Sequence, residues 1–288
     1  MKLSERVGWK RKFTAYLHIL LDALRKFDQD HGFFLSSGIT FSLLICLIPI
    51  ALLLFALVGT YLYSDREVLN HIRSYFENAV PTLDPRIMKN IFRIIRDRKI
   101  VGILGIGGLI WTSTWVFSSL RITLNTVFQV EKGRGVIRGK AIDLLMIILV
   151  MVLLLMSMSV TSVITFIQKY RFSFFVDLGP ITRFIIKYLI PFFFTYWMFF
   201  LIYKIIPNKK VPVKPALQAA LFTSLFWEVA KQLFGWYILH LGRFSMVYGS
   251  LSILAIFFLW IYYSSAILLL GGEMAYLLVK SKNRIINS

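Results

Sequence analysis

The sequence predicts an all-α membrane protein with six transmembrane helices. Of its 288 residues, 58% are hydrophobic and only 16% are charged, whereas a soluble domain carries about 25% charged residues. The apolar residues gather in long runs, and about 20 of them in a helix cross a bilayer. The 33 lysines and arginines against 14 acids give a net charge of +19. In a membrane protein such an excess indicates cytoplasmic loops near anionic headgroups, so we expect anionic lipids as partners and no specific nucleic acid.

Six stretches are long and apolar enough to span the membrane. They cover 38–62, 101–128, 141–167, 184–206, 216–240 and 251–279. We interpret 33–280 as one transmembrane domain, preceded by a cytoplasmic segment (1–32) and followed by a cytoplasmic tail (281–288). The first 30 residues lack the continuous apolar core of a signal peptide, so we expect insertion through a retained helix.

The lysine and arginine counts orient these spans. With both termini inside, the cytoplasmic segments carry 18 of these residues and the outer segments carry 13. Eight of the outer ones lie in one long loop (63–100), where five acids balance them. Because positively charged loops stay on the cytoplasmic side, the counts predict a multi-pass protein with both termini in the cytoplasm.

Two regions outside the spans are predicted to be helical. The N-terminal segment has an apolar stripe with basic residues between its members, which suits a helix on the cytoplasmic leaflet or one packed against the bundle. The stripe consists of Trp9, Phe13, Leu17, Leu20, Leu24 and Phe27, with Lys10, Lys12, Arg25 and Lys26 between them. In the long outer loop, apolar stripes over 68–79 and 87–95 flank Pro81 and predict two short helices over the outer mouth of the bundle.

Several motifs occur together along the chain. They are Ser-Gly-Ile-Thr-Phe-Ser (37–42), Leu-Asn-Thr-Val-Phe-Gln (124–129), Ile-Pro-Asn (206–208), Phe-Trp-Glu-Val-Ala-Lys (226–231), Tyr-Gly-Ser-Leu (248–251) and Leu-Gly-Gly-Glu-Met-Ala (270–275). From about residue 30 to 280 the chain therefore resembles the YihY/BrkB family of bacterial inner-membrane proteins. The resemblance implies a six-span helical protein in that membrane. It implies no reaction, because the family's earlier label, ribonuclease BN, has been withdrawn.

The fifth span carries two charges near its middle, Glu228 and Lys231. An ionised side chain at that depth costs about 2.5–3.5 kcal/mol on insertion scales. Their spacing of three residues puts them on one helix face, where they are expected to pair, and Gln232 lies on the adjoining edge. The pair is either a packing device or a substrate or proton site inside the bundle.

A second polar set is expected in the inner half of the bundle. Arg121 and Glu273 lie at similar depths in the second and sixth spans, so we expect an ion pair between these helices. Asn125, one turn beyond Arg121, would line the same place. Alternatively, the forked guanidinium of Arg121 contacts an anionic headgroup. Asp143 is interpreted as a charge favoured at the start of the third span.

Small residues and prolines indicate points of helix packing and bending. Glycines let membrane helices approach closely, and internal prolines remove a backbone donor and kink a span. The glycines are Gly105, Gly108, Gly271 and Gly272, and the prolines are Pro49 and Pro191. Before the sixth span we expect a turn followed by a serine N-cap, made by Tyr248, Gly249 and Ser250.

The sequence carries no signature of an enzyme. Its four histidines are not paired with acids at a metal-site spacing, and it has no phosphate-binding loop or dinucleotide fingerprint. We therefore expect no catalytic residue, metal or cofactor. The lone Cys46 excludes an intramolecular disulfide.

Three functions can be compared on these grounds. A transporter or flippase-like protein for an amphiphilic or anionic, lipid-like substrate is favoured by the charges inside the spans and the basic surface. A membrane scaffold or envelope-assembly partner is the alternative, with the same charges acting as packing devices. A membrane-anchored ribonuclease is disfavoured, because no cytoplasmic segment groups catalytic carboxylates or histidines.

Overall fold

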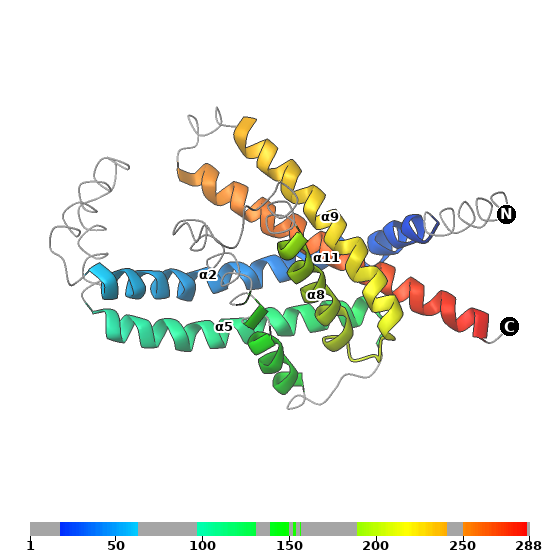
Figure 1. The fold of residues 1–288 in the computed structure, drawn as a ribbon, viewed down its shortest axis with the longest axis horizontal. Coiled ribbons are helices and arrows are strands. Elements are labelled where there is room, and N and C mark those ends of the chain that lie inside the picture. Colours follow the sequence, from blue (N-terminus) through cyan, green and yellow to red (C-terminus); the bar gives the residue numbers. More distant parts are fainter. Residues whose placement is uncertain are drawn as a thin grey trace, which may run out of the picture. The chain divides into compact units, whose positions relative to one another are not determined.

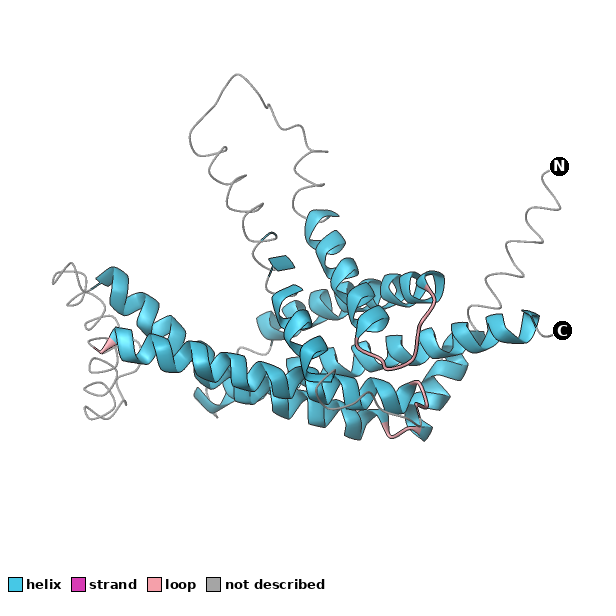
Figure 2. Ribbon diagram, turned by 90° about the horizontal axis from the view of Figure 1, so that it is seen from below, coloured by secondary structure: helices cyan, strands magenta, loops and turns pink. Residues whose placement is uncertain are grey.

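The computed structural model describes residues 18–62, 97–130, 139–149, 152–153, 156, 189–240 and 250–286. Its long helices are α2 (Gly32–Leu62), α5 (Arg98–Val127), α8 (Ile190–Ile205), α9 (Val213–His240) and α11 (Ser250–Ile286). Shorter helical stretches cover 18–29 and 139–149. No strand occurs among the described residues (Figure 2). The predicted all-α class is therefore confirmed for this part of the chain.

The chain divides into two compact units, one made of Met1–Thr40 with Phe117–Ser288 and one made of Phe41–Val116. The smaller unit holds most of α2 and the first two thirds of α5, which run side by side (Figure 1). The larger unit holds α8, α9 and α11, and in it α9 packs against both of the other helices.

In the smaller unit, α5 presents a glycine face to α2. A Cβ atom added at Gly105 would lie 2.9 Å from the side chain of Leu53, and one added at Gly108 would lie 3.2 Å from Cβ of Pro49. Side-chain atoms do not normally approach this closely, so the two helices depend on hydrogen at these positions. The predicted close approach at Gly105 and Gly108 is confirmed, and the ring of Pro49, inside α2, fills part of the space that Gly108 leaves.

In the larger unit, three helices meet at Gly271. A Cβ atom there would lie 1.8 Å from Oγ1 of Thr223 and 2.3 Å from the hydroxyl oxygen of Tyr203. That hydroxyl lies 2.8 Å from Thr223 Oγ1 and donates a 2.7 Å hydrogen bond to the carbonyl of Leu268. A Cβ atom added at the next residue, Gly272, would lie 3.0 Å from the side chain of Leu124 on α5. The helix contacts predicted at these two glycines are thus also confirmed.

The N-terminal helical stretch, 18–29, packs against α11. Ala23 is fully buried beside Met274 and Leu278. Its buried face differs from the predicted stripe, because Leu24 is 46% exposed while Lys26 is buried. Residues 18–29 therefore pack against the bundle, which is one of the two alternatives predicted for this helix. The earlier members of the stripe lie outside the described residues.

Three of the six predicted spans lie in helices long and apolar enough to cross a membrane. These helices are Gly32–Leu57, Lys99–Val127 and Leu254–Ser281. The fourth prediction corresponds to α8, a shorter apolar helix as described, and the fifth to α9, whose charged residues interrupt it. Of the third, 139–149 is described as continuous helix. The two outer helices predicted within 63–96 lie outside the described residues.

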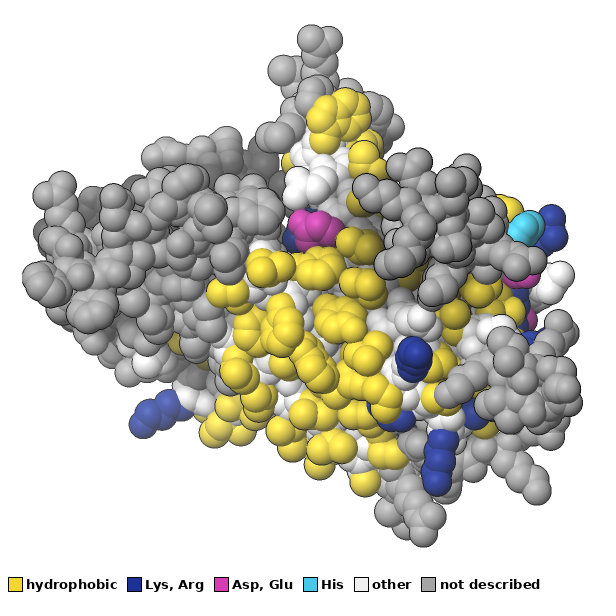
Figure 3. All heavy atoms as spheres, turned by 45° about the vertical axis from the view of Figure 1, so that its right-hand side comes forward, with side chains coloured by type: hydrophobic (Ala, Val, Ile, Leu, Met, Phe, Trp, Pro, Cys, Tyr) yellow, Lys and Arg dark blue, Asp and Glu magenta, His cyan; other side chains and the backbone are white. Residues whose placement is uncertain are grey.

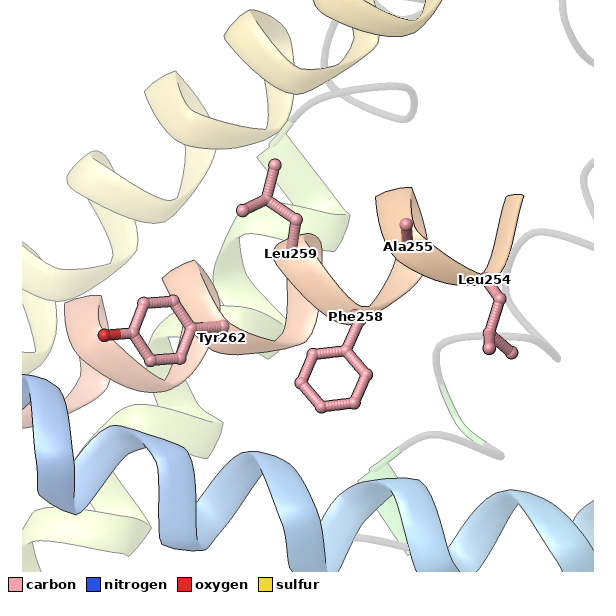
Figure 4. Close-up of a pocket in the computed structure, with 5 residues that line it drawn as sticks. All are labelled: Leu254, Ala255, Phe258, Leu259 and Tyr262. Atoms are coloured by element: carbon pink, nitrogen blue, oxygen red, sulfur yellow. The ribbon is translucent and has the colours of Figure 1, made fainter. Parts of the chain in front are cut away.

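Much of the described surface is apolar, as the side chains in Figure 3 show for one face. Large exposed hydrophobic residues occur on α2, α5, α9 and α11. A soluble monomer rarely shows apolar patches of such extent, whereas a helix facing lipid does. On α11, a hollow of about 470 Å³ is lined by Leu254, Ala255, Phe258, Leu259 and Tyr262 (Figure 4).

Candidate functional site

The charges predicted to meet on α9 do so. Oε2 of Glu228 lies 2.7 Å from Nζ of Lys231, and Nε2 of Gln232 donates a 3.3 Å hydrogen bond to Oε1 of Glu228. The side chains of Glu228 and Lys231 are 32% and 45% exposed. The pair is therefore formed, and it stays open to its surroundings on the described part of the molecule.

Aromatic contacts on the adjoining side of α9 explain why the pair is open. Trp227 packs edge-on against Phe199 of α8 and Trp260 of α11, with ring centroids 5.6 and 5.4 Å apart. Phe234, two turns further, stacks on the same Trp260 at 4.6 Å. These rings fix the rotation of α9 about its axis, so that Glu228 comes to lie beside the packed face rather than within it.

Arg121 has a different partner from the one predicted. Its Nη1 lies 2.8 Å from Oδ1 of Asp143 on the helical stretch 139–149, and its Nη2 donates to Oγ of Ser118 at 3.2 Å. Ser118 in turn donates to Oδ2 of Asp143 at 3.2 Å. The carboxylate is buried, so Asp143 closes a three-residue network rather than serving as a helix-terminal charge in contact with water.

Glu273, the expected partner of Arg121, pairs instead with Lys26 of the N-terminal helix. The distance from Lys26 Nζ to Glu273 Oε2 is 2.8 Å, and Glu273 is 0% exposed. The same ammonium donates to Oδ2 of Asp30 at 2.5 Å and to the carbonyl of Val127 at 2.9 Å. The predicted Arg121–Glu273 pair was therefore wrong, because a residue outside the spans supplies the cation.

Asn125 also has a role that the sequence did not reveal. Its Oδ1 accepts a 2.8 Å hydrogen bond from the backbone N–H of Asn208, in the loop that follows α8. Lys204, at the end of α8, donates to the carbonyl of Val211 in the same loop at 2.5 Å. Asn125 thus fastens the Ile-Pro-Asn segment to α5 and is not part of the Arg121 network.

The sequence reasoning missed Lys26 and Tyr203 as organising residues. A signal for Lys26 was present, because Lys26 lies three residues after Ala23 and four before Asp30, and residues at these spacings share one helix face. For Tyr203 there was none beyond its aromatic type, since its partners lie 20 and 65 residues away in the chain.

The starts of α11 and α8 bear on two predicted structural features. Helix α11 begins at Ser250, the predicted N-cap residue, while Tyr248 and Gly249 lie outside the described residues. Pro191 lies in the first turn of α8 as described, where its missing N–H breaks no hydrogen bond within that helix. A kink at Pro191 would involve the turn before residue 189, which lies outside the described residues, so the expected kink stays a prediction. Over the described ranges, no three His, Cys, Asp or Glu side chains are grouped as a metal site requires.

Comparison with known proteins gives the family. The profile described as "Virulence factor BrkB" matches residues 23–285, nearly the whole chain. The chain belongs to this family. A UPF0761 membrane protein of Haemophilus influenzae (strain 86-028NP) is 25% identical over 254 residues, which cover 87% of this chain and 91% of the relative. No solved structure matches the chain.

Two further relatives match most of the chain. A UPF0761 membrane protein of Pseudoalteromonas atlantica is 26% identical over 281 residues, covering 96% of this chain and 92% of the relative. One of Glaesserella parasuis is 30% identical over 204 residues, covering 69% and 70%. Together with the apolar helices, these relatives show that the chain is a helical membrane protein.

Proposed function

We propose that the protein has six spans and lies in the bacterial inner membrane with both termini in the cytoplasm. Contacts among segments predicted to be cytoplasmic support this arrangement. Lys26, before the first span, bonds to Val127 at the end of the second and to Glu273 near the end of the sixth. Asn208, after the fourth, bonds to Asn125. All these segments therefore reach one end of the larger unit, as the alternation of six spans requires.

Cysteine labelling tests this topology. On a Cys46→Ser background, a cysteine at position 75 should react with a membrane-impermeant maleimide from the outside, and one at position 288 only after permeabilisation. Labelling of position 75 from the cytoplasmic side alone would reverse the orientation.

We further propose that the protein is a transporter or flippase-like protein for an amphiphilic or anionic, lipid-like substrate. The observation that carries this proposal is the exposure of Glu228 and Lys231 near the middle of α9, the helix proposed as the fifth span. Charged groups at that depth are costly and commonly line a substrate or proton path. Among the described residues, the ion pairs Lys26–Glu273 and Arg121–Asp143 are largely buried and joined to further hydrogen-bond partners, so the pair on α9 is the better candidate for contact with a substrate.

The chemistry of the α9 pair suits a lipid headgroup. A phosphate can compete with the Glu228 carboxylate for Lys231. The carboxylate can then pair with a cationic group of the same headgroup or accept a hydrogen bond from one of its hydroxyl groups. Neighbouring exposed residues on α9, Leu225, Val229 and Leu233, are apolar and suit acyl chains. The hollow on α11 offers a second apolar surface of the same kind.

Charge removal at the pair separates transport from a purely structural role. Glu228→Gln alone leaves Lys231 unpaired and should destabilise the protein, whereas Glu228→Leu with Lys231→Leu should fold, because removing both charges avoids the cost of burying one. Purified variants would be reconstituted in liposomes containing a fluorescent phosphatidylglycerol, with and without an imposed pH gradient, and movement between leaflets followed by dithionite bleaching. Leu221→Ala, two turns before Glu228 on the same helix face, removes an exposed apolar side chain without changing charge and serves as the control.

The proposal expects leaflet exchange in the parent and the control and its loss in the folded double leucine variant. If the double leucine variant exchanges the lipid as fast as the parent, the charged pair has only a structural role, and the scaffold function is favoured. If the parent protein exchanges the lipid no faster than protein-free liposomes do, with or without the pH gradient, the protein is not a flippase for this lipid class.

A further inference from the structure

Tyr276, on the last third of α11, is held rigidly at the end of the bundle where the N-terminal helix packs. Its hydroxyl donates a 2.5 Å hydrogen bond to Oε1 of Gln129, and its ring packs edge-on against Phe128 at 6.3 Å. The residue is buried, so its ring is a fixed feature of this end of the larger unit. No part of the proposed transport path uses it.

The backbone at Gln129 shows that this arrangement is maintained against strain. Gln129 has a φ of 51°, in the left-handed region that residues other than glycine rarely adopt. It follows directly after α5, where glycine is the usual residue for such a conformation. A glutamine adopts this conformation less readily than glycine, but its side chain accepts the hydrogen bond from Tyr276. We infer that the position of the ring matters.

Three lysines surround this ring. The Nζ atoms of Lys26, Lys209 and Lys280 lie 4.5, 5.7 and 6.0 Å from its centroid. Lys26 is buried and is neutralised by Asp30 and Glu273. Lys209 and Lys280 are exposed, and no carboxylate in the described part of the chain lies within 4 Å of either.

The two exposed ammonium groups are close enough to serve one ligand. Because both lie near the same centroid, their Nζ atoms are at most about 12 Å apart, and lysine side chains are flexible enough to converge on a single phosphate. The ring stabilises each cation through its negative face and holds both beside one spot. The missing component is an anion.

The position of Lys280 indicates where that anion comes from. It is the next-to-last residue of the apolar stretch Leu254–Ser281, so it lies where a membrane-crossing helix leaves the hydrocarbon and meets the headgroups. Lys209 comes to the same place from the loop between α8 and α9. Arg121, which the sequence suggested for headgroup contact, is occupied by Asp143.

We propose that Lys209 and Lys280, placed around the ring of Tyr276, bind the phosphate of an anionic phospholipid in the cytoplasmic leaflet. The proposal rests on the proposed topology, which puts this end of the bundle at the cytoplasmic surface. It does not require transport, because the site lies apart from Glu228 and Lys231.

The test measures binding of phosphatidylglycerol to the purified full-length protein by native mass spectrometry, with phosphatidylcholine of the same chains for comparison. A direct hydrogen bond to a charged group contributes on the order of tenfold in affinity, so Lys209→Gln with Lys280→Gln should weaken phosphatidylglycerol binding about 100-fold. The control is Lys210→Gln with Lys214→Gln, which removes the same charge from exposed positions in the same region that make no cation–π contact with Tyr276. Thermal unfolding without added lipid verifies that all variants are folded.

The proposal expects a large loss in the Lys209/Lys280 variant, little change in the control and no effect of either on phosphatidylcholine. Tyr276→Phe keeps the ring but loses the bond to Gln129, and should give an intermediate loss. Equal losses in the two lysine variants would show general attraction to a basic surface and overturn the site. Displacement of the lipid by millimolar glycerol phosphate would identify a soluble phosphate ligand and overturn the lipid assignment. These results are independent of the leaflet-exchange assay, so failure of transport and failure of this site can be told apart.

Discussion

Replacing Gly271 by alanine should break the contact that joins α8, α9 and α11. The added methyl group would lie 1.8 Å from Thr223 Oγ1 and 2.3 Å from the Tyr203 hydroxyl. Neither atom is at the end of a long flexible side chain, and the hydroxyl is held by Leu268 on the same helix as the glycine. The helices must therefore separate or the hydroxyl network must break.

The size of the effect follows from the groups involved. Overpacking a tightly packed site costs about 1–3 kcal/mol. Loss of the two hydrogen bonds of Tyr203 adds about 0.6 kcal/mol each, and at most about 1.7 each, in membrane helices. Alanine regains up to about 1 kcal/mol over glycine through its helix propensity. We therefore expect Gly271→Ala to lower the free energy of unfolding by roughly 1–4 kcal/mol.

Gly107→Ala provides a matched control, because a Cβ atom at Gly107 has no neighbour within 4 Å. It should leave stability unchanged or raise it slightly. Both variants would be unfolded in detergent by heat or by sodium dodecyl sulfate and followed by circular dichroism. Adding Thr223→Ala to Gly271→Ala removes the closest clash and should restore part of the loss. The reasoning fails if Gly271→Ala and Gly107→Ala unfold alike, or if Thr223→Ala deepens the loss.

Two further predictions concern the buried ion pairs, and both are measured by the same unfolding assay. Lys26→Met leaves the carboxylate of Glu273 buried without its cation and should cost about 3–5 kcal/mol, whereas Lys26→Met with Glu273→Met should recover most of it. If the single and double variants are equally unstable, the pair is not what holds the N-terminal helix to α11. Arg121→Gln should be destabilising through Asp143 in the same way, and Arg121→Gln with Asp143→Asn should be milder. An Arg121→Gln variant as stable as the parent would show that Asp143 finds another partner.

The features that the sequence predicted well depend on neighbours within one helix or on composition. Glu228 and Lys231 are three residues apart, so helix geometry alone brings them together. Three glycines of α5 recur every three residues, which places them on neighbouring turns of one side of the helix; they are Gly102, Gly105 and Gly108. Apolar length likewise indicated the helices, with α2, α5 and α11 near their expected bounds.

Partners from different helices could not be predicted in the same way. Glu273 and Arg121 were predicted to pair because they lie at similar depths in the membrane. Depth alone does not determine a contact, because the rotation of each helix about its axis decides which faces meet. Glu273 faces the N-terminal helix, where Lys26 reaches it, and Arg121 faces Asp143. The apolar stripe predicted that Lys26 lies on the exposed, basic side of its helix. In the structure Lys26 is buried instead, because it pairs with Glu273.

A structure of the full-length protein in lipid nanodiscs containing phosphatidylglycerol tests the central proposal most directly. If the α9 pair serves a lipid-like substrate, density for a headgroup should lie beside Glu228 and Lys231, with its acyl chains along Leu225, Val229 or Leu233. A face of α9 sealed by another segment or by a second copy of the chain, with both charges paired inside that contact and no lipid near them, would contradict the transport proposal and support a scaffold.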